Sequence, residues 1–97
     1  MGETLRADRQ RASSAAERIK ALAHPLRLRI VALLCAGPTH VSALADELGV
    51  RQSIVSQQLR ILRNHSLVGV ERRDGHAFYH VAEPGLPALI RCIEGCR

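Results

Sequence analysis

The sequence lacks any apolar run long enough to cross a membrane. No stretch of its 97 residues approaches the roughly 18 to 20 consecutive apolar residues that a membrane span requires, so we expect no membrane partner. The opening stretch, MGETLRADRQR, is too polar for a secretory signal peptide. The sequence therefore predicts a cytoplasmic protein.

The sequence also lacks the motifs that are typical of an enzyme's catalytic site. No cysteine has a neighbouring general base in the sequence, and no glycine-rich phosphate loop is present. An enzyme is therefore disfavoured and no catalytic residue is assigned, although a Cys–His pair formed in space stays open. Because internal repeats, linkers and low-complexity segments are absent, residues 1–97 are expected to form one domain. Its core is modest at this length, so dimerisation would stabilise it.

Cysteine is scarce and odd in number. Three cysteines, Cys35, Cys92 and Cys96, argue against a full disulfide framework, and in a reducing compartment free thiols fit better. Cys92 and Cys96 lie one turn apart on a predicted last helix and would share a face. Three interpretations stay open: a thiol redox switch, a trigonal thiolate site for a soft ion such as arsenite or cadmium, and a purely structural role. No cofactor is required otherwise.

Basic residues are abundant, and their placement is uneven. The chain has 14 Lys and Arg against 9 Asp and Glu, a net charge of +5. Within residues 51–73, five arginines face a single glutamate, which leaves +4 in that segment. Such a concentration favours a polyanionic partner.

Two helices are predicted in the first third of the chain. Residues 8–23 place small and apolar residues at helical spacing; they are Ala12, Ala15, Ala16, Ile19, Leu22 and Ala23. The His24–Pro25 pair ends this helix and starts another over residues 25–36. Arg27 and Arg29 are expected on the outer face of the second helix.

The middle of the chain predicts a helix-turn-helix. Residues 41–48 and 52–64 are amphipathic, and Gly49 between them permits a left-handed turn. The second of these helices turns an apolar line inward, and its opposite face carries polar residues that suit base edges and phosphates. The members of that polar face are Ser53, Ser56, Gln57, Arg60 and Asn64.

In the last third of the chain, the spacing of apolar residues changes from a helical to a strand period. Residues 67–73 and 76–81 predict two strands joined by Asp74–Gly75, a strong signal for a two-residue hairpin turn. A final helix follows over residues 86–96, with apolar positions at Leu86, Leu89, Ile90 and Ile93. The fold class is therefore α+β and mainly helical.

This order of elements resembles the ArsR/SmtB family of winged-helix transcriptional repressors. The similarity covers about residues 21–93 and is carried by HPLRLRIVALL, VSALADELGV, VSQQLRILRN and GHAFYHV. The resemblance implies a winged helix-turn-helix of about five helices with a hairpin wing. It also implies a homodimer built from the first and last helices, which represses an operator on double-stranded DNA until an inducer binds.

The resemblance also implies which residues touch DNA. The polar face of the recognition helix falls in the major groove, and the hairpin tip falls along the flanking minor groove or backbone. One departure is Arg51, where the family often has a Ser or Thr helix cap, a loss of about 1 kcal/mol unless a phosphate contact offsets it. The expected DNA-binding residues are Arg51, Gln52, Ser53, Ser56, Gln57, Arg60, Arg72, Arg73 and His76.

Both metal sites known in the family are incomplete in this sequence. At the start of the third helix only His40 has a ligand side chain, and the positions of the second site hold Glu83, Gly85 and Cys96. So few ligands do not close a tetrahedral zinc site.

Family members that sense oxidants or reactive sulfur use one cysteine in the second helix and one in the last. Cys35 lies about one turn beyond the first of these positions, and Cys96 falls slightly early. Thiol oxidation or persulfidation is therefore the favoured inducer chemistry, with a soft metal next. The alternative function is a winged-helix protein-interaction module that binds nucleic acid weakly and has no inducer.

Overall fold

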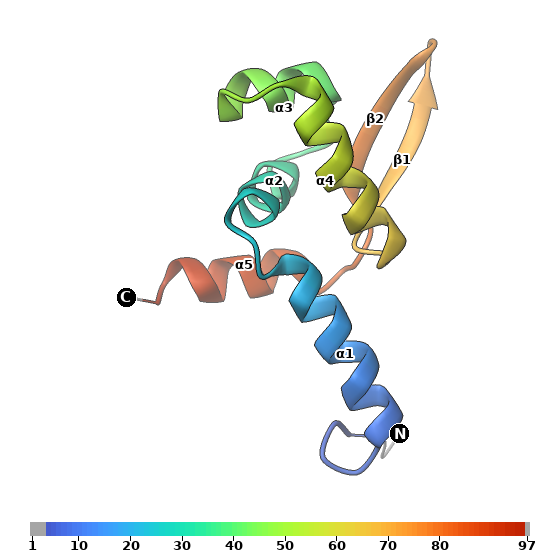
Figure 1. Cartoon of the computed structure of the whole chain (residues 1–97), viewed down its shortest axis with the longest axis vertical. Coiled ribbons are helices and arrows are strands. Elements are labelled where there is room, and N and C mark those ends of the chain that lie inside the picture. The colour runs from blue at the N-terminus through green and yellow to red at the C-terminus, as the bar shows by residue number, and fades with distance from the viewer. Residues whose placement is uncertain (1–3, 97) are drawn as a thin grey trace.

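The computed structural model describes residues 4–96. Within them the chain forms five helices and one antiparallel two-stranded hairpin. The elements are α1 (Arg9–Leu22), α2 (Pro25–Cys35), α3 (Val41–Leu48), α4 (Gln52–Asn64), β1 (Val68–Arg73), β2 (His76–Val81) and α5 (Leu86–Glu94) (Figure 1). The predicted mainly helical α+β fold is confirmed, and the element bounds agree with the sequence pattern to within one residue except at the end of α5.

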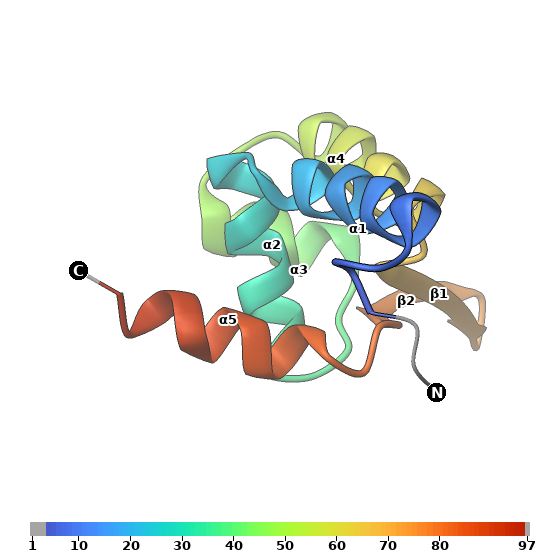
Figure 2. The same ribbon diagram turned by 90° about the horizontal axis from the view of Figure 1, so that it is seen from below.

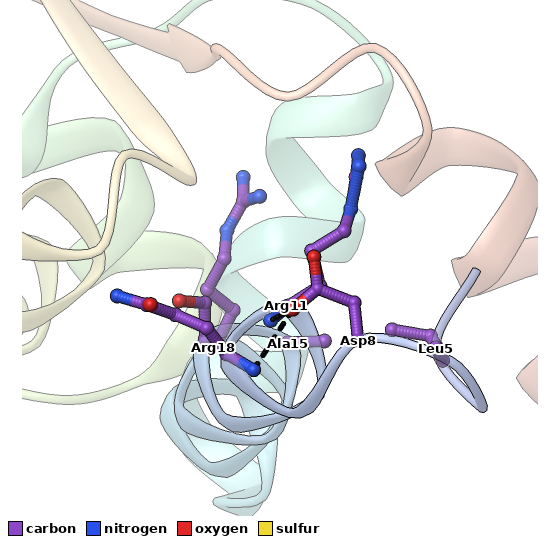
Figure 3. A pocket seen from close by; sticks show the side chains of 7 residues that line it. Leu5, Asp8, Arg11, Ala15 and Arg18 are labelled. Atoms are coloured by element: carbon purple, nitrogen blue, oxygen red, sulfur yellow. Dashed lines mark hydrogen bonds between the residues drawn. The ribbon is translucent and has the colours of Figure 1, made fainter. Parts of the chain in front are cut away.

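Two side-chain caps determine where the first helices begin. Asp8 accepts hydrogen bonds from the backbone N–H groups of Gln10 and Arg11 at 2.9 and 3.0 Å, which satisfies two free donors at the start of α1 (Figure 3). His24 accepts one from the Leu26 N–H at 3.2 Å, while Pro25 occupies the first position of α2. The break between α1 and α2 thus comes from the His24–Pro25 pair, as predicted.

Helix α2 is the centre of the molecule. It contacts α1, α3, α4, α5 and β2, and Ile30 and Val31 on it are completely buried. Figures 1 and 2 both show α2 surrounded by the other elements. One apolar cluster, drawn from every helix and from β1, therefore holds the helix-turn-helix and the terminal helices together.

The helix-turn-helix with its hairpin and the two terminal helices occupy different parts of the molecule. Helix α3 and the hairpin tip lie at one end, α1 extends to the opposite end, and α5 runs across the middle toward one side (Figure 1). Among residues 4–96, no helix is both long and apolar enough to pass through a membrane.

Candidate nucleic-acid interface and thiol sites

Helix α4 separates an apolar line from a polar face. Val55, Leu59 and Leu62 are at most 1% exposed and fix the helix against the core. The opposite side is open to solvent, and its exposed polar residues are Gln52, Ser53, Ser56, Gln57, Arg60 and Asn64. The structure therefore exposes every residue of the predicted polar face, with donors and acceptors of the kind that base edges bond.

A tight turn sets the angle between α3 and α4. Gly49 adopts a left-handed backbone conformation with φ of +68°, and its N–H bonds the carbonyl of Ala45 at 2.8 Å. Arg51 begins α4 without a capping side-chain bond, as expected from the missing Ser or Thr. Its side chain is exposed at the helix N-terminus, where the helix dipole already favours an anion.

The hairpin is a basic extension beside α4. Its turn residues Asp74 and Gly75 have φ of +51° and +79°, which matches the predicted two-residue turn. Arg72, Arg73 and His76 are exposed at the tip. Arg73 also lies 3.4 Å from the Glu71 carboxylate and 5.5 Å from the centre of the Phe78 ring, so it is the more constrained of the two arginines.

The base of the hairpin is tied to the helix-turn-helix. Thr39 and Tyr79 exchange two backbone hydrogen bonds of 3.1 and 2.7 Å. The bonded pair holds the start of α3 and strand β2 at a fixed separation. The wing therefore cannot move far without moving the helix-turn-helix.

His40 is a helix cap in this structure. Its Nδ1 accepts a hydrogen bond from the Ala43 N–H at 3.3 Å and lies 2.8 Å from the Ser42 hydroxyl oxygen. Its ring also meets Phe78 edge to face, with centroids 5.8 Å apart. Between residues 4 and 96 no three His, Cys, Asp or Glu side chains gather into a metal-binding group. We therefore assign His40 a capping role in place of the weak metal-ligand role expected from sequence.

Sequence reasoning missed a cleft on the same side. The cleft has a volume of about 330 Å³ and is lined by His40 at the start of α3, Ser42 of α3, Gln52 of α4 and His76 of the hairpin. Sequence reasoning also missed Ile54, an apolar residue on α4 that is 39% exposed. Neither could be read from the helical pattern, because both depend on how the hairpin and the turn pack around α4.

The three cysteines are free and differ in exposure. Cys35 ends α2 and is half-buried, while Cys92 and Cys96 are exposed, and all three are free. Helix α5 ends at Glu94, two residues before the predicted end at Cys96. The Cys96 Sγ still donates to the carbonyl oxygen of Cys92 at 3.5 Å, so the two residues are neighbours one turn apart. A trigonal site made of all three thiols does not form within residues 4–96.

The surroundings of Cys35 disfavour its thiolate. Burial raises the pKa of the Cys35 thiol, the nearby Glu94 carboxylate raises it further, and Arg91 acts in the opposite sense. Because Glu94 and Arg91 belong to the last turns of α5, Cys35 lies close to that end of the helix. A raised thiol pKa makes Cys35 a slow nucleophile at neutral pH.

Glu83 is used in an ion pair. Its carboxylate accepts a 2.7 Å hydrogen bond from Arg18 of α1 and a 3.0 Å bond from the Gly85 N–H. The Gly85 bond, followed by the Arg18 bond, lowers the pKa of Glu83. These contacts fasten α1 to the segment before α5, so the carboxylate at the second family metal position already has two partners.

Helices α1 and α5 expose large apolar side chains. Ile19 is 61% exposed, Leu89 38% and Ile93 42%, although the helical spacing of α1 and α5 placed all three on apolar faces. A groove of about 190 Å³ runs between the two helices, lined in part by Ile19 and Leu89. A second, polar hollow of about 550 Å³ lies along the first turns of α1, near Leu5, Arg11 and Arg18 (Figure 3).

Comparisons with known proteins agree on one group of regulators. Residues 24–69 match the arsR family of bacterial regulatory proteins. The chain is 43% identical over 83 residues to the HTH-type transcriptional regulator NmtR of Mycobacterium tuberculosis, covering 86% of this chain and 69% of that protein. It is 33% identical over 84 residues to the biofilm growth-associated repressor of Xylella fastidiosa, covering 87% and 74%.

Solved structures give the same result. Reduced HlyU from Vibrio cholerae superposes with a TM-score of 0.82 at 27% identity and covers 92% of this chain and 96% of its own. The homodimeric winged helix-turn-helix domain of Mb0332 from Mycobacterium bovis superposes with a TM-score of 0.80 at 29% identity, covering 96% and 85%.

Proposed function

Because this chain belongs to the ArsR family of bacterial regulatory proteins, we propose that it is a repressor that binds a short operator as a homodimer and is released when its thiols react. The family consists of transcription regulators, so the chain is not an enzyme. The observation that carries the proposal is the exposed polar face of α4 beside the exposed basic hairpin tip. Its place of action is the cytoplasm, where bacterial chromosomal DNA lies.

The DNA contacts divide into two kinds. Gln57 and Arg60 read base edges, since glutamine pairs with adenine and arginine with guanine in the major groove. Arg72 at the hairpin tip binds phosphates and supplies affinity without sequence preference. Arg51, Gln52, Ser53, Ser56, Arg73 and His76 complete the proposed surface.

A homodimer accounts for the apolar faces of α1 and α5. Isolated apolar side chains are common on surfaces, but Ile19, Leu89 and Ile93 sit on two helices that flank one groove. Covering them with a second copy would place two recognition helices on one side of the assembly. Two successive major grooves, about 34 Å apart, would then be read by one dimer.

Release is proposed to begin at an exposed thiol. Cys92 or Cys96 reacts first because each is exposed, whereas Cys35 is half-buried and its pKa is raised. A peroxide oxidises the exposed thiol to a sulfenic acid as its O–O bond breaks and water leaves, and the Cys35 thiol then displaces the sulfenic hydroxyl as a second water to form the disulfide. With a polysulfide, the exposed thiolate attacks an S–S bond to form a persulfide while the shortened polysulfide leaves, and Cys35 then displaces hydrosulfide to form the same disulfide. The bond would join the end of α2 to the end of α5, which belongs to the proposed dimer face.

The closeness of Cys35 to the last turns of α5 supports this chemistry over a soft-metal site. A disulfide requires Cα atoms within about 7 Å, whereas a trigonal thiolate site needs three sulfurs together, and no such group forms within the part of the chain that the structure describes. One similar structure is specified as the reduced form of its protein, so redox state was distinguished for that relative.

The test is a fluorescence-anisotropy titration of DNA from upstream of the chain's own gene. Reduced protein, protein treated with peroxide or persulfide, and protein treated with arsenite or cadmium are compared, together with Cys35→Ser, Cys92→Ser and Cys96→Ser. Loss of binding only after thiol oxidation, abolished by the Cys35 change and by one of the others, is the expected result. Loss with metal alone would replace the redox switch by a thiolate site, and no response to either would make the cysteines structural.

A further inference from the structure

Arg27 of α2 bonds two other helices at once. Its Nε donates to the carbonyl oxygen of Ala21 in the last turn of α1, and its Nη1 donates to the Gln58 side-chain oxygen on α4 at 2.9 Å. The sequence pattern places Arg27 on the outer face of α2, yet the structure finds it half-buried where α1, α2 and α4 meet. That prediction was wrong because helical spacing shows which side of a helix is polar but not whether a neighbouring helix packs against that side.

The chemistry of this contact is specific to arginine. A helix leaves its last carbonyls without partners, and Arg27 satisfies one of them at the end of α1. The planar guanidinium can bond the carbonyl and the amide oxygen together because its donors lie in a rigid fork, which a lysine ammonium does not reproduce. Hydrogen bonds with a charged donor are also stronger than neutral ones.

The contact connects two surfaces with different tasks. Helix α1 exposes Ile19 on the proposed dimer face, and α4 exposes Gln57 on the proposed reading face next to Gln58 in sequence. We propose that Arg27 is a positioning residue, which through Gln58 holds the recognition helix at a fixed angle to α1 and so sets the half-site spacing that the dimer accepts. This proposal rests on the proposed function as a DNA-reading homodimer.

A positioning role predicts a particular pattern of losses. Tilting α4 against α1 would displace both recognition helices of a dimer in opposite directions, so the match to two grooves would worsen. Contacts to phosphates tolerate such a shift, because they carry no sequence information and are spread along the duplex. Specific binding should therefore weaken while non-specific binding is retained.

The experiment uses the full chain and a duplex that the wild-type protein selects from a random-sequence pool. Its affinity is measured by anisotropy, alongside an unselected duplex and versions of the selected one with a base pair added or removed between the half-sites. The variants are Arg27→Lys, Gln58→Met and the double variant. Gln58→Glu keeps the acceptor, and Arg29→Lys changes an exposed arginine on the same helix. Ultracentrifugation and circular dichroism confirm that each variant is a folded dimer.

The expected result is a roughly tenfold loss of affinity for the selected duplex in Arg27→Lys and in Gln58→Met, with weaker discrimination between spacings. The double variant should lose no more than either single one, because the two residues form one contact. Gln58→Glu and Arg29→Lys should stay within about twofold of the wild type.

Two results would overturn the positioning role. One is unchanged affinity and spacing preference in both Arg27→Lys and Gln58→Met. The other is an equal loss for selected and unselected duplexes in step with a loss of folded protein, which would mean a structural role alone. If the wild-type protein selects no sequence at all, the proposed function fails as well, so the two failures are told apart by the wild-type result.

Discussion

The two exposed surfaces of this molecule are built from opposite chemistry. The side formed by α4 and the hairpin presents polar and basic side chains such as Gln57 and Arg72 over a fully buried apolar line. The side formed by α1 and α5 leaves Ile19 and Ile93 in solvent. One surface suits a hydrated polyanion and the other suits a second apolar surface, which is why we assign them to DNA and to a second copy of the chain.

The largest effect should come from placing a charge on the apolar surface. Ile93→Asp would bury a carboxylate in the proposed dimer contact, so we expect the dimer dissociation constant to rise at least about thirtyfold, in line with interface hot spots. Sedimentation velocity over a range of concentrations measures this. The control is Ser66→Asp, a charge added at an exposed loop position. If Ile93→Asp stays as dimeric as the control, α5 does not form the interface.

On the polar surface, two substitutions should separate recognition of the base sequence from binding to the phosphates. Gln57→Ala should cost about 1 to 3 kcal/mol on the preferred sequence and lower the sequence preference. Arg72→Ala should weaken binding to all sequences and reduce the slope of log affinity against log salt by about 1. Anisotropy at several salt concentrations checks both. Equal, small effects from the two variants would contradict the division of roles.

The thiols should react at different rates. Because burial and Glu94 raise the pKa of Cys35, we expect iodoacetamide to modify Cys35 about tenfold more slowly than Cys92 or Cys96 at pH 7.5, with the order read by mass spectrometry. Unfolding in urea should bring the rates together. Fast labelling of Cys35 in the folded protein would mean that it, and not an exposed thiol, starts the proposed oxidation.

The smallest expected effect is on the folding stability that the Arg18–Glu83 ion pair contributes between α1 and the segment before α5. Since the folded-state pKa of Glu83 lies below its usual value, the stability from its carboxylate is present above the ordinary glutamate pKa and disappears as the pH falls through the folded-state pKa. Glu83→Gln should therefore be less stable than the wild type at pH 7, and the difference should shrink in acid. Urea denaturation measures it, with exposed Glu17→Gln as the control. A difference that does not depend on pH would contradict this origin.

Local sequence signals were sufficient for the elements and for the polar face. The His24–Pro25 break, the left-handed Gly49 and the Asp74–Gly75 turn depend on neighbouring residues only, so each could be predicted before the fold was known. The exposed side of α4 followed from its period, because one clear apolar line fixes the opposite face.

Contacts between distant segments could not be predicted in this way. The Arg27–Gln58 bond and the Arg18–Glu83 pair join residues far apart in the chain, and no spacing rule brings them together. The end of α5 before Cys96 was also missed, since nothing in the last residues marks a helix stop except Gly95. The thiol chemistry depends on such contacts, so it was the least predictable part of the site.

The most direct test of the central claim is the affinity of reduced protein for a selected duplex and for a scrambled duplex of the same composition, measured from about 50 to 200 mM salt. A sequence-reading repressor should bind the selected duplex more tightly at every salt concentration, while its affinity falls steeply as salt rises. A protein-interaction module would show neither preference nor steep salt dependence, and that result would contradict the account.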